Sequence, residues 1–411
     1  MTLDPYLALR VPSFRRFVGG HVLAVIGQGM LAVAVGWELY DRTGSALSLG
    51  IVGLVQVIPL IIFVLPAGQL ADRMDRRLIL MAAEATMALA ALGLAAASVS
   101  LAPTWVYYLL LAVFGTGRAF QLPAKQAIMP NLVPPGALTN AVTWNSGGWQ
   151  AADVIGPALG GFVIAWTGSA AGAYLVCAIT ALAFLILVAR ARTTRVPPSI
   201  TKQTWGEFLE GVRFVRRSPI LLAALSLDLF AVLLGGVIAL LPVFAKDILQ
   251  VGPVGLGWLR ASQSLGAVLM SIALAHQPPF RQAGKTLLAA VTAFGVAIIV
   301  FGLSRNFFLS LGALFLAGAF DAVSVVIRLA LAQIATPDVL RGRVSAVNTL
   351  FIGMSNELGE AESGFLAAAI GPVGAVVVGG AGAIAVTLIW AYIFPELRRA
   401  KTFDPPKELL T

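Results

Sequence analysis

Long stretches without a charged residue are the feature that most constrains this 411-residue chain. A helix needs about 20 apolar residues to cross a bilayer, and each stretch is long enough for one or two crossings. With 59% hydrophobic and only 11% charged residues, the chain cannot cover its surface with charge in water. An ordinary soluble domain is therefore excluded. The charge-free stretches lie between Arg42 and Asp72, between Glu84 and Arg118, between Asp153 and Arg190, and between Glu362 and Glu396.

Turn signals divide these stretches into helices. Ala102-Pro103, Thr167-Gly168-Ser169 and Gly371-Pro372 each interrupt an apolar run. Helices are expected because a lipid-exposed backbone must satisfy its own hydrogen bonds, and the strand alternation of a membrane barrel is absent. The pattern predicts an all-α integral membrane protein with twelve transmembrane helices, at about 14–39, 47–71, 77–98, 104–125, 139–166, 171–191, 219–245, 254–275, 284–303, 308–334, 343–370 and 373–394.

The positive charges indicate the orientation of the chain. With the N-terminus placed in the cytoplasm, 22 of the 28 Lys and Arg residues, Lys125 among them, fall on that side. Only Arg42, Lys246 and Arg305 fall outside, and Arg118, Arg260 and Arg328 lie within helices. Lys and Arg concentrate in cytoplasmic loops, so both termini are expected there. The net charge of +9 is then a topology signal. Binding of nucleic acid is not expected, because the longest polar stretch, 190–218, is too short to be a basic soluble domain.

Metal and enzyme chemistry find little support in the composition. Cys177 is the only cysteine, and His21 and His276 are too few and too far apart to suggest a Cys/His metal site. An integral-membrane enzyme should instead cluster His, Asp or Cys at one membrane face. No G-x-x-x-x-G-K-[ST] loop is present, which argues against direct ATP hydrolysis. We therefore expect no metal and no cofactor, and a proton gradient as the driving force.

The chain is expected to consist of two related halves. Residues 1–191 form an N-terminal six-helix bundle, 192–217 a polar cytoplasmic linker, and 218–411 a C-terminal six-helix bundle with a short cytoplasmic tail. At a gap-free offset of 203, residues 115–162 match the second half at nine of 48 positions. This weak likeness and the equal division of the helices fit two parallel repeats related by an axis along the membrane normal.

The loop between the second and third predicted helices carries a distinctive motif. It reads Gly68-Gln69-Leu70-Ala71-Asp72-Arg73-Met74-Asp75-Arg76-Arg77. It resembles the loop 2–3 signature of the major facilitator superfamily, with Asp75 where a glycine is commoner. The resemblance implies that Gly68, Asp72, Arg73, Arg76 and Arg77 form a cytoplasmic latch that holds the outward-facing state. In the alternative interpretation the three arginines only fix the orientation.

The fifth predicted helix contains Gly156-Pro157-Ala158-Leu159-Gly160-Gly161. Small residues four apart let helices approach closely, and proline permits a bend. This segment resembles the helix 5 motif of the superfamily's antiporters, which favours export over uptake. The alternative is ordinary glycine packing. In the second half the residue equivalent to Pro157 is Glu360, so that half lacks the motif.

A wider resemblance covers nearly the whole chain and indicates a bacterial branch of the superfamily. It is similar to enterobactin exporters and macrolide-efflux relatives, which implies the two-halved, pseudo-symmetric major facilitator fold in a bacterial inner membrane. One departure is that Arg118 follows Gly115 and Gly117, whereas the usual helix 4 motif places its arginine ahead of a glycine pair. The segments that carry the resemblance are 120–124, 129–134, 341–345, 355–359, 362–364 and 394–399.

A few charged residues are placed inside the predicted helices. An ionisable group in mid-bilayer is costly unless it is paired or hydrated, so each is a functional candidate. Counting about 1.5 Å per residue puts Asp153, Asp228, Asp321 and Glu357 near mid-depth, and Arg118 somewhat toward the cytoplasm. By family resemblance, helices 1, 4, 7 and 10 line a central cavity. We expect Asp228 and Asp321 to exchange a proton or a cationic substrate against the fixed charge of Arg118.

Alternatives remain for each of these residues. Arg118 and Asp321 are equivalent under the 203-residue offset, and a permanent salt bridge between them would join the two halves. Asp153 and Glu357 are expected at the interface of the halves, where gating, packing and direct proton carriage are all open. Glu84 is expected to pair with the arginines of the loop 2–3 motif.

These observations predict a secondary active exporter. It would carry an amphipathic small molecule, such as a drug or a siderophore, out of the cell by proton antiport and alternating access. Its partners would be the lipid bilayer, the cargo and protons, and it would work as a monomer. The alternative is a lipid or lysolipid flippase, or another substrate transporter of the same fold.

Overall fold

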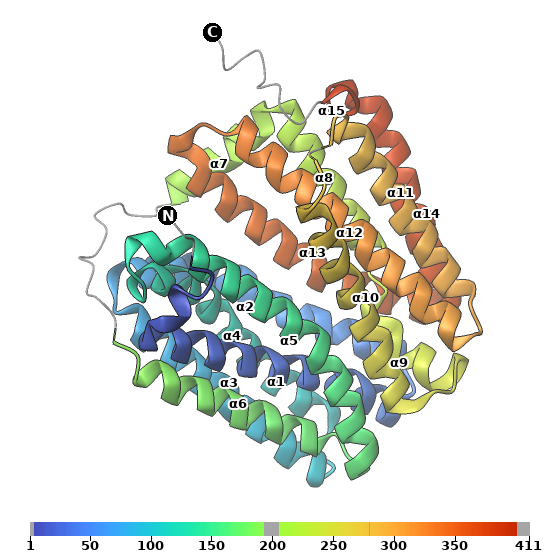
Figure 1. Ribbon diagram of the computed structural model, residues 1–411. Helices are drawn as coiled ribbons and strands as arrows, with labels where there is room; N and C mark the ends of the chain where they lie inside the picture. The colour runs from blue at the N-terminus through green and yellow to red at the C-terminus, as the bar shows by residue number, and fades with distance from the viewer. Residues whose placement is uncertain (1–3, 193–204, 279, 401–411) are drawn as a thin grey trace. The chain divides into compact units, whose positions relative to one another are not determined.

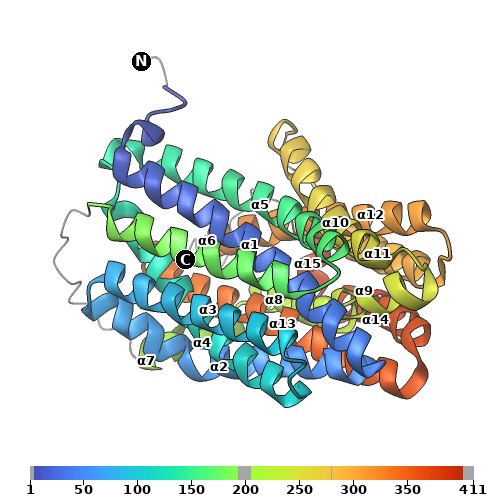
Figure 2. The ribbon, with the colours of Figure 1, turned by 90° about the horizontal axis from the view of Figure 1, so that it is seen from below.

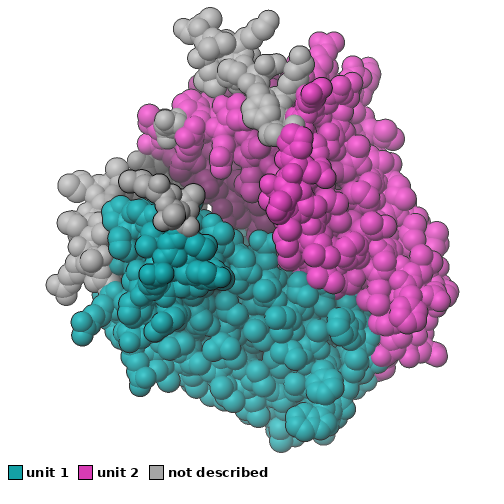
Figure 3. Space-filling view, viewed as in Figure 1, with its two compact units in different colours: residues 1–44, 55–203, 252–261 teal, residues 45–54, 204–251, 262–411 magenta. Residues whose placement is uncertain are grey.

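The computed structural model describes residues 4–192, 205–278 and 280–400 of the chain (Figure 1). The chain divides into two compact units, which Figure 3 draws in different colours. Unit 1 contains residues 1–44, 55–203 and 252–261, and unit 2 contains residues 45–54, 204–251 and 262–411. The helices α2 (Ala46–Arg73) and α10 (Gly252–Ala275) therefore contribute to both units.

The described residues form helices and turns, with no strand among them, which confirms the predicted all-α membrane class. Among the described residues, eight helical stretches are long and apolar enough to cross a membrane by length and composition. The long helices are α1 (Pro12–Thr43), α2 (Ala46–Arg73), α3 (Arg76–Val99), α4 (Thr104–Ile128), α5 (Leu138–Thr167), α6 (Ala171–Ala189), α8 (Pro219–Leu234), α10 (Gly252–Ala275), α11 (Ala283–Leu303), α12 (Phe307–Ala335), α13 (Arg341–Ile370) and α14 (Pro372–Ile393).

Unit 1 is a bundle in which α1 packs on α5 and α6, and α3 packs on α4 and α6 (Figures 1 and 2). The start of α1, the end of α2, the start of α3 and the end of α4 meet in one apolar cluster. Phe14, Phe17 and Phe184 are completely buried in it. This cluster fixes the end of unit 1 at which the loop 2–3 motif lies.

Unit 2 has a corresponding arrangement of its own helices. Helix α11 packs on α12 and α14, and α8 packs on α12, α13 and α14. The amphipathic helix α7 (Trp205–Arg217) lies against α13, where Val215 packs with Val344 and Val347. Residues 192–217 are predicted from the sequence to form a polar linker, and this helix is not among the predicted helices. It was missed because its apolar residues occupy only one face and alternate with charges.

The seventh predicted span, 219–245, corresponds to one membrane-length stretch, Pro219–Ile248, but this stretch is not the continuous helix that was predicted. Helix α8 ends at Leu234, and short 3₁₀, α and π turns cover Ile238–Ile248. Close packing explains the break. A Cβ atom on Gly235 would come within 2.6 Å of Phe294, and one on Gly236 within 2.8 Å of the backbone of Gly359. The two glycines let α13 and α11 approach the backbone where the helix is interrupted.

The helix bounds reveal the repeat more clearly than the identities do. The 203-residue offset carries the bounds of α5, Leu138–Thr167, onto the bounds of α13, Arg341–Ile370. It also carries the first residue of α4, Thr104, onto the first residue of α12, Phe307. Equivalent positions of the two halves can therefore be compared residue by residue.

Candidate functional site

Helices α4 and α12 each carry three polar residues at equivalent positions. On α4 they are Arg118, Gln121 and Lys125, which we call the α4 stripe. The 203-residue offset places them on Asp321, Ser324 and Arg328, the α12 stripe. A spacing of three and then four residues brings each set onto one face of its helix.

The α12 stripe contains a buried ion pair. The Arg328 Nη1 atom lies 2.5 Å from the Asp228 Oδ2 atom of α8, and the two residues are only 4% and 6% exposed. A buried charge is tolerated when an opposite charge and hydrogen bonds replace its hydration. The pair therefore links the first and fourth long helices of unit 2 and holds Asp228 in place.

Asp321 and Ser324 lie beside this pair. Together with Asp228, Phe294 and Phe320 they line a void of about 10 Å³. The electrostatic field of Arg328 acts on Asp321 as well as on Asp228. The Ser324 Oγ and Arg328 Nε atoms are buried without a hydrogen-bond partner. The site thus combines two carboxylates and one guanidinium with unused hydrogen-bonding capacity.

The α4 stripe contacts a different set of partners. The Lys125 Nζ atom lies 2.9 Å from His21 Nε2 of α1, and the His21 Nδ1 atom lies 3.0 Å from the Oδ1 atom of Asn145 on α5. An ammonium group can only donate, so Nε2 accepts and Nδ1 carries the proton that is donated to Asn145. This arrangement requires a neutral imidazole between a cation and an amide.

The other two residues of the α4 stripe bind neighbouring helices of unit 1. Gln121 Nε2 donates to Glu84 Oε1 of α3 over 2.5 Å, and both side chains are buried. Arg118 Nη1 donates to Gln56 Oε1 of α2 over 3.0 Å. Glu84 was expected to pair with the arginines of the loop 2–3 motif, and this expectation is wrong. The Glu84 carboxylate instead faces α4, two turns into the helix.

Each stripe therefore ends in a cation that contacts the first long helix of its own unit. Lys125 contacts His21 on α1, and Arg328 contacts Asp228 on α8. The contact in unit 1 joins a cation to a neutral ring, whereas the contact in unit 2 joins opposite charges. Only the site in unit 2 has two acidic groups, Asp228 and Asp321, beside one cation. A proton or a small cation bound there would change the net charge of the site.

The comparisons with known proteins identify the family. A family model described as transmembrane secretion effector matches residues 3–406. The chain belongs to this family. It is a membrane exporter of the major facilitator superfamily, in the branch of the enterobactin exporters, and is a transporter rather than an enzyme.

Relatives and solved structures agree with this assignment. The enterobactin exporter EntS of Shigella flexneri is 25% identical over 96% of this chain and 94% of its own length. Its counterpart in Escherichia coli O1:K1 / APEC is 26% identical over the same shares. A bacterial homologue of the human lysosomal transporter Spinster covers 94% of this chain and 98% of its own, with a TM-score of 0.71 at 16% identity. The nucleoside transporter NupG covers 95% and 100%, with a TM-score of 0.72 at 14% identity. The two structures share the fold.

The loop 2–3 motif of this major facilitator protein is fixed by its backbone contacts. Arg76 donates to the carbonyl oxygens of Ala71 and Ala127, and so ties the end of α2 to the end of α4. Asp75 caps α3 by accepting from the backbone amide of Arg77. The Asp72 side chain lies outside the described residues, and Gly68 lies within the last turns of α2. The latch itself stays a prediction.

Arg73 and Arg77 of the same motif are placed differently from Arg76. Arg73 is exposed in the last turn of α2, and Arg77 is half-buried in the first turn of α3. Neither side chain has a hydrogen bond or ion pair within the described residues.

The helix 5 motif brings α5 against α1. A Cβ atom on Gly156 would come 2.7 Å from the Ile26 carbonyl oxygen, and one on Gly160 would come 2.8 Å from the Cα atom of Met30. Gly161 faces the other way, toward Pro253 and Gly257 in the part of α10 that belongs to unit 1. Pro157 packs against Gly29. The motif thus serves packing on two faces of α5, and its antiporter role stays a prediction.

The remaining predicted residues lie on α5 and α13. Asp153 is half-buried on α5 in unit 1, and Glu357 is 9% exposed on α13 in unit 2. The backbone of Glu357 packs against Gly53 at the start of α2. Neither position decides between gating, packing and proton carriage. The predicted approach of Arg118 to Asp321 also stays a prediction.

Two residues that complete the stripes, Arg328 and Lys125, are not among the site residues predicted from the sequence. Arg328 was recognised as an arginine within a helix but was not included in the site, and Lys125 was counted only as a loop charge. The available signal was the spacing, because Arg328 follows Asp321 by seven residues, two turns along the same face. Applying the 203-residue offset to that spacing would have found Lys125 as well.

Proposed function

We propose that this protein exports an amphipathic small molecule across a bacterial cytoplasmic membrane by proton antiport and alternating access. Both termini would face the cytoplasm, as the distribution of Lys and Arg favours. The protein would work as a monomer, with the proton gradient as its only energy source. The enterobactin exporters among its relatives support a siderophore or a drug-like molecule as cargo.

The observation that carries this proposal is the group formed by Asp321, which is half-buried, and the buried pair of Asp228 and Arg328. Two ionised carboxylates and one guanidinium have a net charge of −1, and such an excess charge is costly inside a membrane. One proton or one monovalent cationic group would neutralise it. The proton and a cationic part of the cargo would then compete for the same place, which is the requirement for antiport.

The ion pair between Asp228 and Arg328 also gives a reason why the cargo would leave only in exchange for a proton. Removing one partner of a buried pair leaves an uncompensated charge, at a cost of about 3–5 kcal/mol. Neutralisation of Asp228 by a proton frees Arg328 to interact fully with Asp321. Loss of that proton restores the original pair. We therefore assign the fixed positive charge of the site to Arg328, and the sequence-based assignment of that role to Arg118 is not required.

The decisive experiment is substrate-induced proton flux in proteoliposomes. The panel contains siderophores, macrolides, cationic dyes and lysolipids, because the cargo class is part of the proposal. Asp228→Asn and Asp321→Asn should each reduce the flux to the level of empty liposomes while the protein remains folded. Glu396→Gln, which changes an exposed acid on α15 (Pro395–Arg399), is the matched control and should leave the flux unchanged.

Two outcomes contradict the proposal. Full coupling in both Asp228→Asn and Asp321→Asn would exclude these carboxylates as the proton carriers. Flux that responds to none of the compounds in the wild-type protein would argue against export of an amphipathic cargo. A response to lysolipids alone would favour the flippase alternative.

A further inference from the structure

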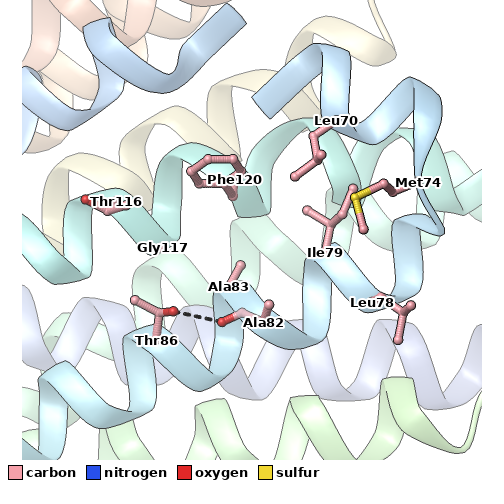
Figure 4. Close-up of a pocket in the computed structure, with 10 residues that line it drawn as sticks. All are labelled: Leu70, Met74, Leu78, Ile79, Ala82, Ala83, Thr86, Thr116, Gly117 and Phe120. Atoms are coloured by element: carbon pink, nitrogen blue, oxygen red, sulfur yellow. Dashed lines mark hydrogen bonds between the residues drawn. The ribbon is translucent and has the colours of Figure 1, made fainter. Parts of the chain in front are cut away.

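An apolar groove of about 430 Å³ lies within unit 1, at the end that holds the start of α1. The end of α2, the first half of α3 and the middle of α4 form its walls (Figure 4). Leu70, Met74 and Ile79 gather at one end of the groove, and Thr86 and Thr116 lie at the other. The groove is separate from the polar contacts of the α4 stripe.

The lining offers no free polar group. The Thr86 hydroxyl donates to the Ala82 carbonyl oxygen of its own helix, and the Thr116 hydroxyl donates to that of Ala112, each over 2.9 Å. The other lining residues are aliphatic, aromatic, methionine or glycine. A water-filled groove with such walls would be unfavourable, so a hydrocarbon chain is the chemistry that fits it.

Two arginines are chain neighbours of residues that line the apolar end of the groove. Met74 and Leu78, which are 50% and 55% exposed, line it there. Arg73 precedes Met74 in the chain, and Arg77 precedes Leu78. The Arg77 Nε atom is buried without a hydrogen-bond partner. Arg76 is committed to the carbonyl oxygens of Ala71 and Ala127, whereas Arg73 and Arg77 are not committed to any described group.

We propose that this groove binds one acyl chain of an anionic phospholipid, whose phosphate group interacts with Arg73 and Arg77. The chain of the lipid covers the apolar walls, and the arginines sit beside its headgroup at the edge of the bilayer. Basic residues next to a membrane segment attract anionic headgroups in this way. The lipid then ties the end of α2 to α3 and α4. This site is distinct from the transport site and does not depend on the proposed antiport.

The test measures lipid binding to the purified full-length protein. Spin-labelled phosphatidylglycerol and phosphatidylcholine, each with its nitroxide on the acyl chain, are compared in phosphatidylcholine vesicles that contain the protein. We expect tighter immobilisation of phosphatidylglycerol, and Arg73→Gln and Arg77→Gln should each weaken its binding about fivefold. Arg15→Gln, an exposed position in the first turn of α1, is the charge-matched control and should have no effect.

A second pair of variants tests the groove itself. Ala82→Phe places a ring in the groove from an exposed position of α3, and it should displace the immobilised chain. Ala96→Phe makes the same change at an exposed position near the other end of α3 and should not. Equal immobilisation of the two lipids, or equal binding to these two variants, would overturn the proposal. A lipophilic cation that displaces the lipid and binds more tightly than phosphatidylglycerol would also overturn the proposal. The groove would then be a binding site for cargo.

Discussion

The α4 stripe and the α12 stripe occupy equivalent positions in the two units but differ in chemistry. In unit 1 the stripe binds four other helices through mostly neutral partners, namely His21, Gln56, Glu84 and, through His21, Asn145. In unit 2 it makes one concentrated ion pair with α8 and leaves Ser324 and part of Arg328 without partners. The equivalent positions thus carry different contacts: the α4 stripe connects helices, and the α12 stripe holds the ion pair to which the proposed antiport assigns proton exchange.

The largest difference between the stripes should appear when their terminal cations are removed. Arg328→Met leaves Asp228 buried without its counter-charge, so we expect a loss of about 3–5 kcal/mol in the free energy of unfolding. Lys125→Met removes a cation whose partner is a neutral ring, and the expected loss is about 1–3 kcal/mol for the unsatisfied His21 Nε2 atom. Chemical unfolding in detergent micelles measures both.

The double variant Asp228→Leu with Arg328→Met shows whether Arg328→Met loses stability because Asp228 is left without its counter-charge or because the arginine itself is missing. Replacing a whole buried pair by apolar residues is often neutral, but Asp321 then lacks the counter-charge of Arg328, so part of the stability should return while proton coupling does not. If Lys125→Met lowers the free energy of unfolding as much as Arg328→Met does, the two stripes do not differ in how strongly their terminal cations are needed, and the comparison is wrong.

The sequence predicted the fold well because the signals for membrane helices are strong and local. Charge-free runs such as the one from Glu84 to Arg118 leave few alternatives, and helices α3 and α4 begin and end within a few residues of their predicted bounds. The break at Gly235 and Gly236 was missed because its cause is tertiary, namely the backbone of α13 and the ring of Phe294. Apolar composition alone does not distinguish a broken helix from a continuous one.

The candidate site was predicted only in part, for a related reason. Mid-membrane carboxylates are conspicuous in a sequence, so Asp228 and Asp321 were found. Their partner depends on which helices pack together, and the sequence favoured the equivalent residue Arg118 over Arg328, which lies two turns away on the same helix as Asp321. Glu84 illustrates the same limit, because its partner Gln121 lies on α4 and not in the nearby loop.

A second difference concerns the middle residues of the stripes, beginning with Gln121. It is the only hydrogen-bond donor to Glu84 within the described residues, and Glu84 is completely buried. Gln121→Leu should therefore cost about 1–3 kcal/mol, the penalty for an unsatisfied buried acceptor. Unfolding monitored by tryptophan fluorescence gives the value. A loss below about 0.5 kcal/mol would mean that Glu84 finds another partner, and that the α4 stripe is less tightly connected than its contacts indicate.

The smallest expected effect belongs to Ser324, the counterpart of Gln121. Its Oγ atom is buried without a partner, so Ser324→Ala removes no hydrogen bond and should change the free energy of unfolding by less than about 0.5 kcal/mol. Its position beside the void lined by Asp228 and Asp321 leads to a different expectation for transport. If the hydroxyl assists the passage of a proton, Ser324→Ala should slow proton flux, whereas Ser324→Thr, which keeps the hydroxyl, should not. Equal flux in both variants would restrict the exchange function of the α12 stripe to its charged residues.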